Sequence, residues 1–283
     1  MIKFNDTPIE SYIVSNKIIY VKREDLCTNY PMPPLAKMRG VYEFLKKQHN
    51  LIGNMDTRVS KSGQGVAVIC KDLGLPYEYF VQQLKGEDIY LRDTVKVAIE
   101  CGAKIYPMQA TRNSIFFSRA KKIVDNKNGI LLPVGLPFYE TVLEIVRVIK
   151  TVSKEYLTGT IIMATGTGTI MSGVLCGLIE RLIMPQLVIG ISAGWSIEKQ
   201  KKLINNNTER YSDSKQDMFY YRNFRSEIIH KLKLYHSKRA YYEHTPVDIP
   251  FPAHNTYEGK TWEWLLENIN NLPEPILFWN IGS

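Results

Sequence analysis

The sequence lacks the features of several common protein classes. Its four cysteines, Cys27, Cys70, Cys101 and Cys176, include no Cys-x-x-Cys pair, so we expect neither a zinc ribbon nor a disulfide framework. No apolar run reaches the roughly 18 residues of a membrane span. The first residues show no charged start followed by a long apolar run, so secretion is not expected either. These absences favour a cytoplasmic protein with reduced thiols, no membrane partner and no metal site.

The composition is that of an ordinary globular protein. The 283 residues are 45% hydrophobic, 11% aromatic and 23% charged, which argues against disorder and against a coiled coil. This length is enough for two domains, since a domain typically has about 150 residues. Lys and Arg number 36 against 28 Asp and Glu, a formal net charge of +8. This surplus raises the question of an anionic partner.

Short apolar runs alternate with longer amphipathic stretches, which predicts an α/β fold with parallel sheets flanked by helices. The expected strands are 17–21, 77–82, 104–108, 129–133, 160–164, 186–192 and 275–279. The expected helices are 36–48, 63–73, 88–101, 114–125, 138–155, 170–180 and 260–269.

The sharpest local motif is the run Thr165-Gly166-Thr167-Gly168-Thr169, which follows a predicted strand and precedes a predicted helix. Glycines allow a ligand close to the backbone, hydroxyls can donate hydrogen bonds, and the N–H groups of a first helical turn are free to bind an anion. The motif is neither a Walker A sequence nor a dinucleotide fingerprint. It predicts a phosphate-binding loop, the alternative being a glycine-rich turn without a ligand.

Two further segments could carry chemistry. The turn Ser60-Lys61-Ser62-Gly63 opens a predicted helix, where hydroxyls and free N–H groups could hold a carboxylate. Lys37 stands at the start of another predicted helix, where the helix dipole and partial burial would lower the pKa of its amine. Such a lysine can act as a nucleophile, although most lysines are solvated surface charges and most such serines are helix caps.

Read in order, the motifs VKREDL, PLAKMRG, SKSGQGVA, TGTGT and TYEGK and the terminal ILFWNIGS resemble the pyridoxal-phosphate enzymes of the tryptophan synthase β-subunit fold (fold type II). Within them the chain is most similar to the 1-aminocyclopropane-1-carboxylate deaminase and D-cysteine desulfhydrase group. The resemblance implies two open twisted sheets flanked by helices, with a cofactor cleft between a larger domain (1–38 and 129–283) and a smaller one (39–128). A homodimer is also implied.

The resemblance also implies a role for each matching residue. Lys37 would form the Schiff base with pyridoxal 5'-phosphate and act as a base, and Ser60 would contact the substrate or move a proton. Tyr257 would face the substrate and Glu258 the ring nitrogen, where a carboxylate favours the protonated pyridinium. The remaining cofactor-binding residues would be Lys61 and the loop residues Thr165, Gly166, Thr167, Gly168 and Thr169.

The chain departs from the family's usual motifs at three places. Lys61 replaces an asparagine, and residues 33–36 replace the glycines and asparagine that commonly precede the catalytic lysine. Asn280-Ile281-Gly282-Ser283 replaces the usual His-Thr-Gly-Gly. Lys61 is also a rival for the Schiff base, but its position inside the anion-binding turn favours Lys37.

The segment Ser196 to Thr245 matches the family least and holds eleven Lys and Arg residues against six Asp and Glu, with six tyrosines among them. Cations neutralise phosphates and aromatic rings stack on bases, so the segment could bind nucleic acid. The competing interpretation is a solvated helical face with its tyrosines packed inward.

Three functions follow from these observations. The first is a lyase or deaminase-like enzyme that acts on a small amino acid by α-proton abstraction or β-elimination. The second is a pyridoxal-phosphate enzyme acting on an amino acid attached to a DNA base, as in viral DNA hypermodification. The third is a non-catalytic descendant that binds the cofactor or nothing.

Overall fold

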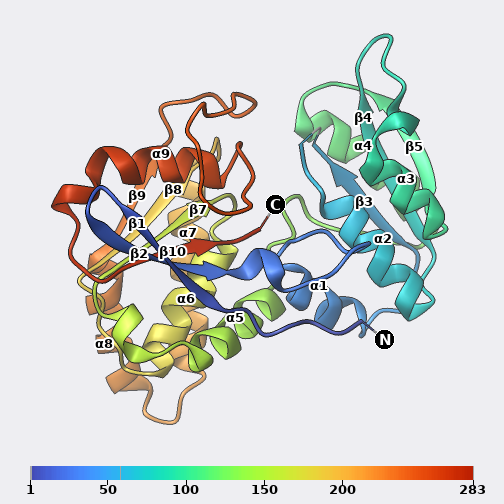
Figure 1. Cartoon of the computed structure of the whole chain (residues 1–283). Helices are drawn as coiled ribbons and strands as arrows, with labels where there is room; N and C mark the ends of the chain where they lie inside the picture. Colours follow the sequence, from blue (N-terminus) through green and yellow to red (C-terminus); the bar gives the residue numbers. More distant parts are fainter. Residues whose placement is uncertain (1, 58, 283) are drawn as a thin grey trace. The chain divides into compact units, whose positions relative to one another are not determined.

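A computed structural model of the chain describes residues 2–57 and 59–282. The chain divides into two compact units, which are considered separately below. The first unit comprises residues 2–4 and Thr28–Pro137, and the second comprises Asn5–Cys27 and residues 138–282. Each unit is built on one β-sheet (Figure 1).

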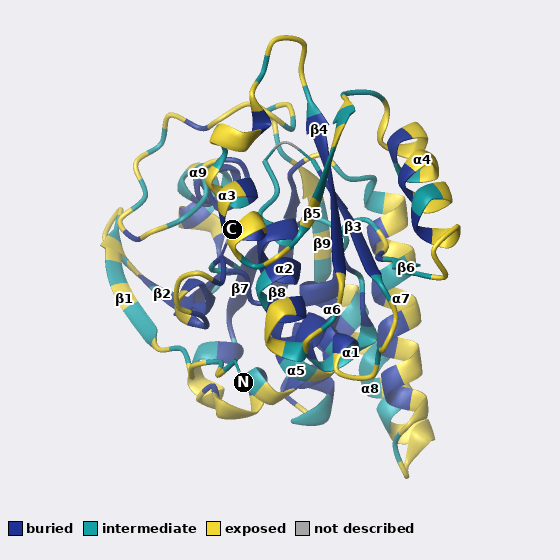
Figure 2. Cartoon of the chain, turned by 90° about the vertical axis from the view of Figure 1, so that its right-hand side faces the viewer, coloured by how far each residue is buried: buried dark blue, intermediate teal, exposed yellow. Residues whose placement is uncertain are grey.

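The first unit has a four-stranded sheet of order β5-β4-β3-β6, in which every neighbouring pair is parallel. Its strands are β3 (Ile52–Asp56), β4 (Tyr77–Gln83), β5 (Lys104–Gln109) and β6 (Ile130–Leu131). Its helices are α1 (Met38–Leu45), α2 (Ser62–Leu73), α3 (Asp93–Glu100) and α4 (Asn113–Asp125). Figure 2 shows α4 on one side of this sheet and α2 and α3 on the other. The apolar residues that α4 and the sheet bury together are Met55, Phe80, Phe116, Ala120 and Val124.

The second unit has a six-stranded sheet of order β1-β2-β10-β7-β8-β9, with only the β1–β2 pair antiparallel among its described strands. The strands are β1 (Ile9–Val14), β2 (Lys17–Arg23), β7 (Thr160–Thr165), β8 (Leu187–Ser192), β9 (Leu232–His236) and β10 (Ile276–Asn280). The helices are α5 (Tyr139–Thr151), α6 (Thr169–Glu180), α7 (Ile197–Asp213), α8 (Met218–Lys231) and α9 (Glu258–Asn268). Helix α9 covers one face of the sheet through Trp262 and Leu265, which pack on Ile162, Ile189 and Phe278.

The predicted fold class is confirmed, because both sheets are flanked by helices and all seven predicted strands are present, each end within two residues of its expected position. The sequence did not reveal β1, β3, β9, α7 or α8. The compact units do not coincide with the predicted domains, since residues 2–4, 28–38 and 129–137 group with the first unit. The physical reason for the later segment is that Ile130 and Leu131 pair with β3 as the edge strand of its sheet.

Candidate functional site

The predicted phosphate loop connects β7 to α6. Gly168, the residue before the helix, has φ +91°, a left-handed conformation that glycine adopts without a Cβ clash. The hydroxyls of Thr167 and Thr169 lie 2.7 Å apart. The buried Thr165 hydroxyl has no hydrogen-bond partner among the described residues. The loop therefore offers hydroxyls beside the N–H groups of the first turn of a helix.

This geometry fits a phosphate group. A Cβ placed on Gly166 would meet only Trp195, at 3.6 Å, so the backbone there is open to a close ligand. Helix α6 is buried along nearly its whole length, and its dipole places positive charge at Thr169. A phosphate would also supply an acceptor for the buried Thr165 hydroxyl, which a buried polar group requires.

Lys37 immediately precedes α1, and its Nζ donates a hydrogen bond to the Gly135 carbonyl at 3.0 Å. The surrounding protein desolvates the ammonium and lowers the pKa of Lys37 from 10.5 to about 8, while the negative charge of nearby Asp56 opposes this shift. Helix α1 lies close against α2, because a Cβ on Gly65 would come within 2.4 Å of the Met38 sulfur. The amine is thus held in place and poised near neutral pH, as a nucleophile or base requires.

The Ser60 turn opens α2 as predicted, with Lys61 as the residue preceding the helix. The Ser60 hydroxyl donates to the Ser62 hydroxyl at 3.0 Å and accepts from the Ser62 N–H at 3.1 Å. The Ser62 hydroxyl in turn donates to Asp56, the last residue of β3. Sequence reasoning missed Asp56, which only the course of β3 brings to this turn.

Tyr257 and Glu258 lie where α9 begins, and Glu258 is fully buried as the first residue of that helix. The Tyr257 hydroxyl is 2.6 Å from the hydroxyl of Tyr241. Tyr241 belongs to the basic segment, which the motifs did not link to the site. No local pattern in the sequence marks this contact, because sixteen residues separate the two tyrosines.

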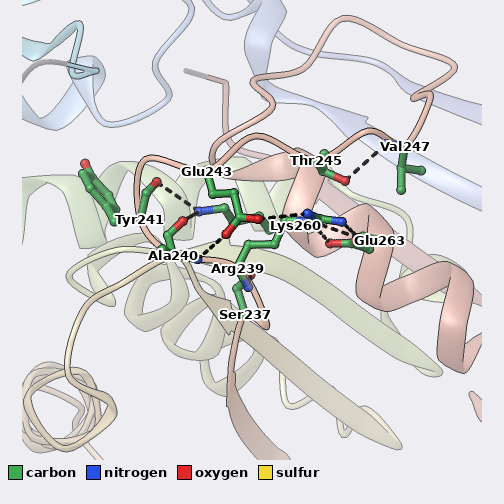
Figure 3. Close-up of polar contacts among 9 residues, drawn as sticks. All are labelled: Ser237, Arg239, Ala240, Tyr241, Glu243, Thr245, Val247, Lys260 and Glu263. Atoms are coloured by element: carbon green, nitrogen blue, oxygen red, sulfur yellow. Dashed lines mark hydrogen bonds and ion pairs between the residues drawn. The ribbon is translucent and has the colours of Figure 1, made fainter.

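Hydrogen bonds and an ion pair hold the turn that carries Tyr241 against α9 (Figure 3). The buried Lys260 ammonium donates to the carbonyls of Ala240, at 2.6 Å, and Tyr241, at 3.0 Å. Arg239 binds Glu263 of α9, with Nε 2.8 Å from Oε2. The lysine of the TYEGK motif therefore holds the turn from which the Tyr241 side chain reaches the Tyr257 hydroxyl.

The rest of the basic segment forms α7, α8 and β9. Its tyrosines do not share one environment, since Tyr211 is buried whereas Tyr220, Tyr235 and Tyr242 are 41–49% exposed. Four of its cations are engaged in ion pairs with described carboxylates, namely Lys215, Arg222, Lys238 and Arg239. In contrast, three exposed lysines near the start of α7 form no ion pair with a described residue: Lys199, Lys201 and Lys202.

The predicted site residues fall in both units. Lys37, Ser60 and Lys61 lie in the first unit, and the loop 165–169, Tyr257 and Glu258 lie in the second. Of the C-terminal departures, Asn280 has a structural role, since its amide donates to Asp25 and to the Pro252 carbonyl, each at 2.9 Å. Ser283 lies outside the described residues.

Residues 2–57 and 59–282 contain neither a metal-binding cluster nor a membrane-spanning helix. No group of three or more His, Cys, Asp or Glu side chains there is arranged to hold a metal ion. None of the described helices combines the length and apolarity needed to cross a membrane.

Known proteins resemble this chain over its whole length. No protein-family model matches it. A glycyl-dTMP PLP-dependent decarboxylase of Pseudomonas phage M6 is 29% identical over 291 residues, covering 99% of both chains.

Among solved structures, an ACC deaminase homologue has a TM-score of 0.76 at 19% identity and covers 100% of this chain and 90% of its own. The processed form of threonine deaminase isoform 2 from Solanum lycopersicum has a TM-score of 0.62 at 14% identity, covering 99% of this chain and 84% of its own. These likenesses confirm the resemblance seen in the motifs: the chain has the fold of the pyridoxal-phosphate enzymes of the tryptophan synthase β-subunit type, fold type II.

Proposed function

We propose that this protein is a pyridoxal-phosphate-dependent enzyme that decarboxylates an amino acid attached to a pyrimidine nucleotide, as a step in DNA modification. The observation that carries the proposal is the end-to-end similarity to the phage glycyl-dTMP decarboxylase, at 29% identity over 99% of both chains. Of the three functions weighed from the sequence, this one develops the second, with loss of carbon dioxide as the reaction.

The residues of the site supply the parts that such an enzyme needs. Lys37 would hold the cofactor aldehyde through its amine, whose pKa of about 8 leaves an appreciable unprotonated fraction near neutral pH. The loop 165–169 would bind the cofactor phosphate, and Glu258 would face the ring nitrogen. When bound, pyridoxal phosphate supplies an electron sink for the pair left on the substrate α-carbon.

The overall reaction is balanced without an oxidant or reductant. The bond between the α-carbon and the carboxylate breaks, carbon dioxide leaves, and a proton replaces it on the α-carbon. The product keeps its amino group as a primary amine on the base. Lys37 is the candidate for delivering the proton, and the paired hydroxyls of Tyr241 and Tyr257 form a second group that can donate one.

The first function from the sequence, elimination or deamination of a free amino acid, has weaker support than decarboxylation. Its relatives among solved structures share the fold at 19% identity or less. The departures at Lys61 and residues 280–283 also lie at positions where the deaminase group has its usual motifs.

The test is turnover by the purified protein supplied with pyridoxal phosphate. Glycyl-dTMP, DNA that contains the same base, free glycine, and free serine and cysteine, which have a β-leaving group, are offered separately, and carbon dioxide, ammonia and the amine product are measured. We expect carbon dioxide and amine from the nucleotide or the DNA and no ammonia. Ammonia from a free amino acid would instead support the lyase, and no turnover of any substrate would support the non-catalytic alternative.

A pair of variants tests the role of Lys37. Lys37→Ala should abolish both turnover and the visible absorbance of the lysine-bound cofactor, whereas Lys61→Ala should retain that absorbance. The reverse result would assign the cofactor to Lys61.

A further inference from the structure

Asp56 is a buried carboxylate to which the proposed reaction assigns no task. It ends β3, is 3% exposed and accepts at least three hydrogen bonds from described residues. The donors are the Ser62 hydroxyl, the Gly63 N–H and the Tyr79 hydroxyl, the last at 3.1 Å. All of these atoms belong to the first unit.

The three donors favour the ionised carboxylate. A peptide N–H can only donate, and the Ser62 hydroxyl already accepts from Ser60, so its own proton is directed to Asp56. Burial raises the pKa of Asp56 above its usual range, and these hydrogen bonds offset only part of that shift. The ammonium of Lys37 adds a favourable charge interaction.

Asp56 occupies the anion position at the start of α2. Gly63 brings its N–H to the carboxylate only because it has no side chain: a Cβ there would lie 2.1 Å from the Tyr79 ring and 2.7 Å from Asp56 Oδ2. The sequence led us to expect a substrate carboxylate at this helix start. The structure places the protein's own carboxylate on those donors instead.

We propose that Asp56 is a specificity-determining residue that fills the anion position of α2 and prevents the substrate carboxylate from binding there. This inference rests on the proposed decarboxylation and gives it a physical basis. A carboxylate held by N–H and O–H donors is stabilised as an anion, which opposes its conversion to neutral carbon dioxide. A resident negative charge occupies those donors and repels the substrate carboxylate while it is still an anion.

The first experiment measures carboxylate binding without turnover. The full-length protein with pyridoxal phosphate is titrated with sodium formate at constant ionic strength, against sodium chloride, and thermal stabilisation is followed. We expect Asp56→Asn to bind formate at least about tenfold more tightly than the wild type, since the like charge is gone and two donors are released. Equal formate affinity in the two proteins would overturn the proposal.

The matched control is Asp93→Asn. Asp93 also lies in the first turn of a helix, α3, but its side chain is 93% exposed, so formate affinity should not change. If Asp56→Asn does not fold, Asp56→Ser keeps an acceptor for the Gly63 N–H and replaces it in the comparison.

A second measurement uses the wild type alone and compares binding of glycine and methylamine through the cofactor spectrum. Similar affinities are expected, because the glycine carboxylate gains no donors from α2. A glycine preference of tenfold or more would overturn the proposal.

The failure of the inference can be told apart from the failure of the proposed function. Absence of carbon dioxide release from every substrate would refute decarboxylation, while the formate comparison would still decide whether Asp56 excludes carboxylates. If decarboxylation is observed, Asp56→Asn should lower both KM and kcat, because the substrate carboxylate is then held as an anion. A merely structural role would raise KM or leave it unchanged.

Discussion

Replacement of Lys260 by methionine tests whether a buried ammonium holds the turn that carries Tyr241. The lysine is 1% exposed, and its Nζ donates to the carbonyls of Ala240 and Tyr241 (Figure 3). Methionine has a similar apolar stem, so the substitution removes the charge and both hydrogen bonds while preserving most of the packing.

The expected cost follows from these two bonds. Hydrogen bonds from a charged donor contribute about 1.5–3 kcal/mol each. Desolvation lowers the pKa of Lys260, which shows that part of this gain is offset by burying the ammonium. We therefore expect Lys260→Met to reduce the free energy of unfolding of the second unit by about 2–4 kcal/mol.

Urea unfolding followed by tryptophan fluorescence measures this loss, since Trp262 and Trp264 lie on α9 beside Lys260. The matched control is Lys238→Met, because Lys238 is 73% exposed and pairs with Glu267 on the surface, so its removal should have no measurable effect. Exchange of the backbone amide hydrogens of residues 239–243 should also be faster than in the wild type in Lys260→Met and unchanged in Lys238→Met. Equal stability of the two variants would refute the reasoning.

Three other predictions concern Lys37, the glycines of the two helix-start turns, and the exposed lysines of α7. The pKa of Lys37 falls from 10.5 to about 8 on folding, so the unfolded state binds more protons between these pH values and wild-type stability should rise across them. Lys37→Met should therefore be more stable than wild type near pH 7, by up to about 3 kcal/mol, and in urea titrations this difference should shrink above pH 8 and disappear above about pH 10.5. Gly63→Ala should lower the free energy of unfolding of the first unit by about 1–3 kcal/mol in the same assay, because the added Cβ would lie 2.1 Å from the Tyr79 ring. In Gly166→Ala the nearest atom to the added Cβ lies at 3.6 Å, so the free energy of unfolding should hardly change. If α7 binds DNA, reversing the charges of Lys199, Lys201 and Lys202 should reduce the magnitude of the slope of log affinity against log salt by about 3. An unchanged slope would show that these lysines do not contact DNA.

The strands that the sequence revealed are those with unbroken apolar runs. Strand β7 reads Thr160–Thr165 with every residue buried, and its pattern was sufficient to predict it. Strand β3 is also buried at every position, but Gly53 and Asn54 interrupt its run, so it was missed. Helices α7 and α8 were missed because they expose most of their residues, and the buried face of α7 is largely polar, formed by Gln200, Ile204, Asn207, Thr208, Tyr211 and Ser212.

The motif residues were found because local chemistry marks them. A glycine-threonine loop between a strand and a helix is recognisable in one dimension, and the structure places Thr169 at the start of α6. Asp56 and Tyr241 carry no such mark. Asp56 meets Tyr79 because β3 and β4 pair in parallel, and Tyr241 meets Tyr257 because Lys260 holds its turn.

The sequence by itself determined the fold class, the position of the glycine-threonine loop and the lysine at a helix start, since apolar periodicity and glycine placement act over a few residues. Only the tertiary structure decided which charged side chains are already paired within the protein and which are exposed. It engaged Lys238 and Arg239 in ion pairs, left the start of α7 exposed, and placed the Asp56 carboxylate where the sequence suggested a substrate. The physical reason is that hydrogen bonds and ion pairs depend on distances between segments remote in the chain, which strand pairing and helix packing establish.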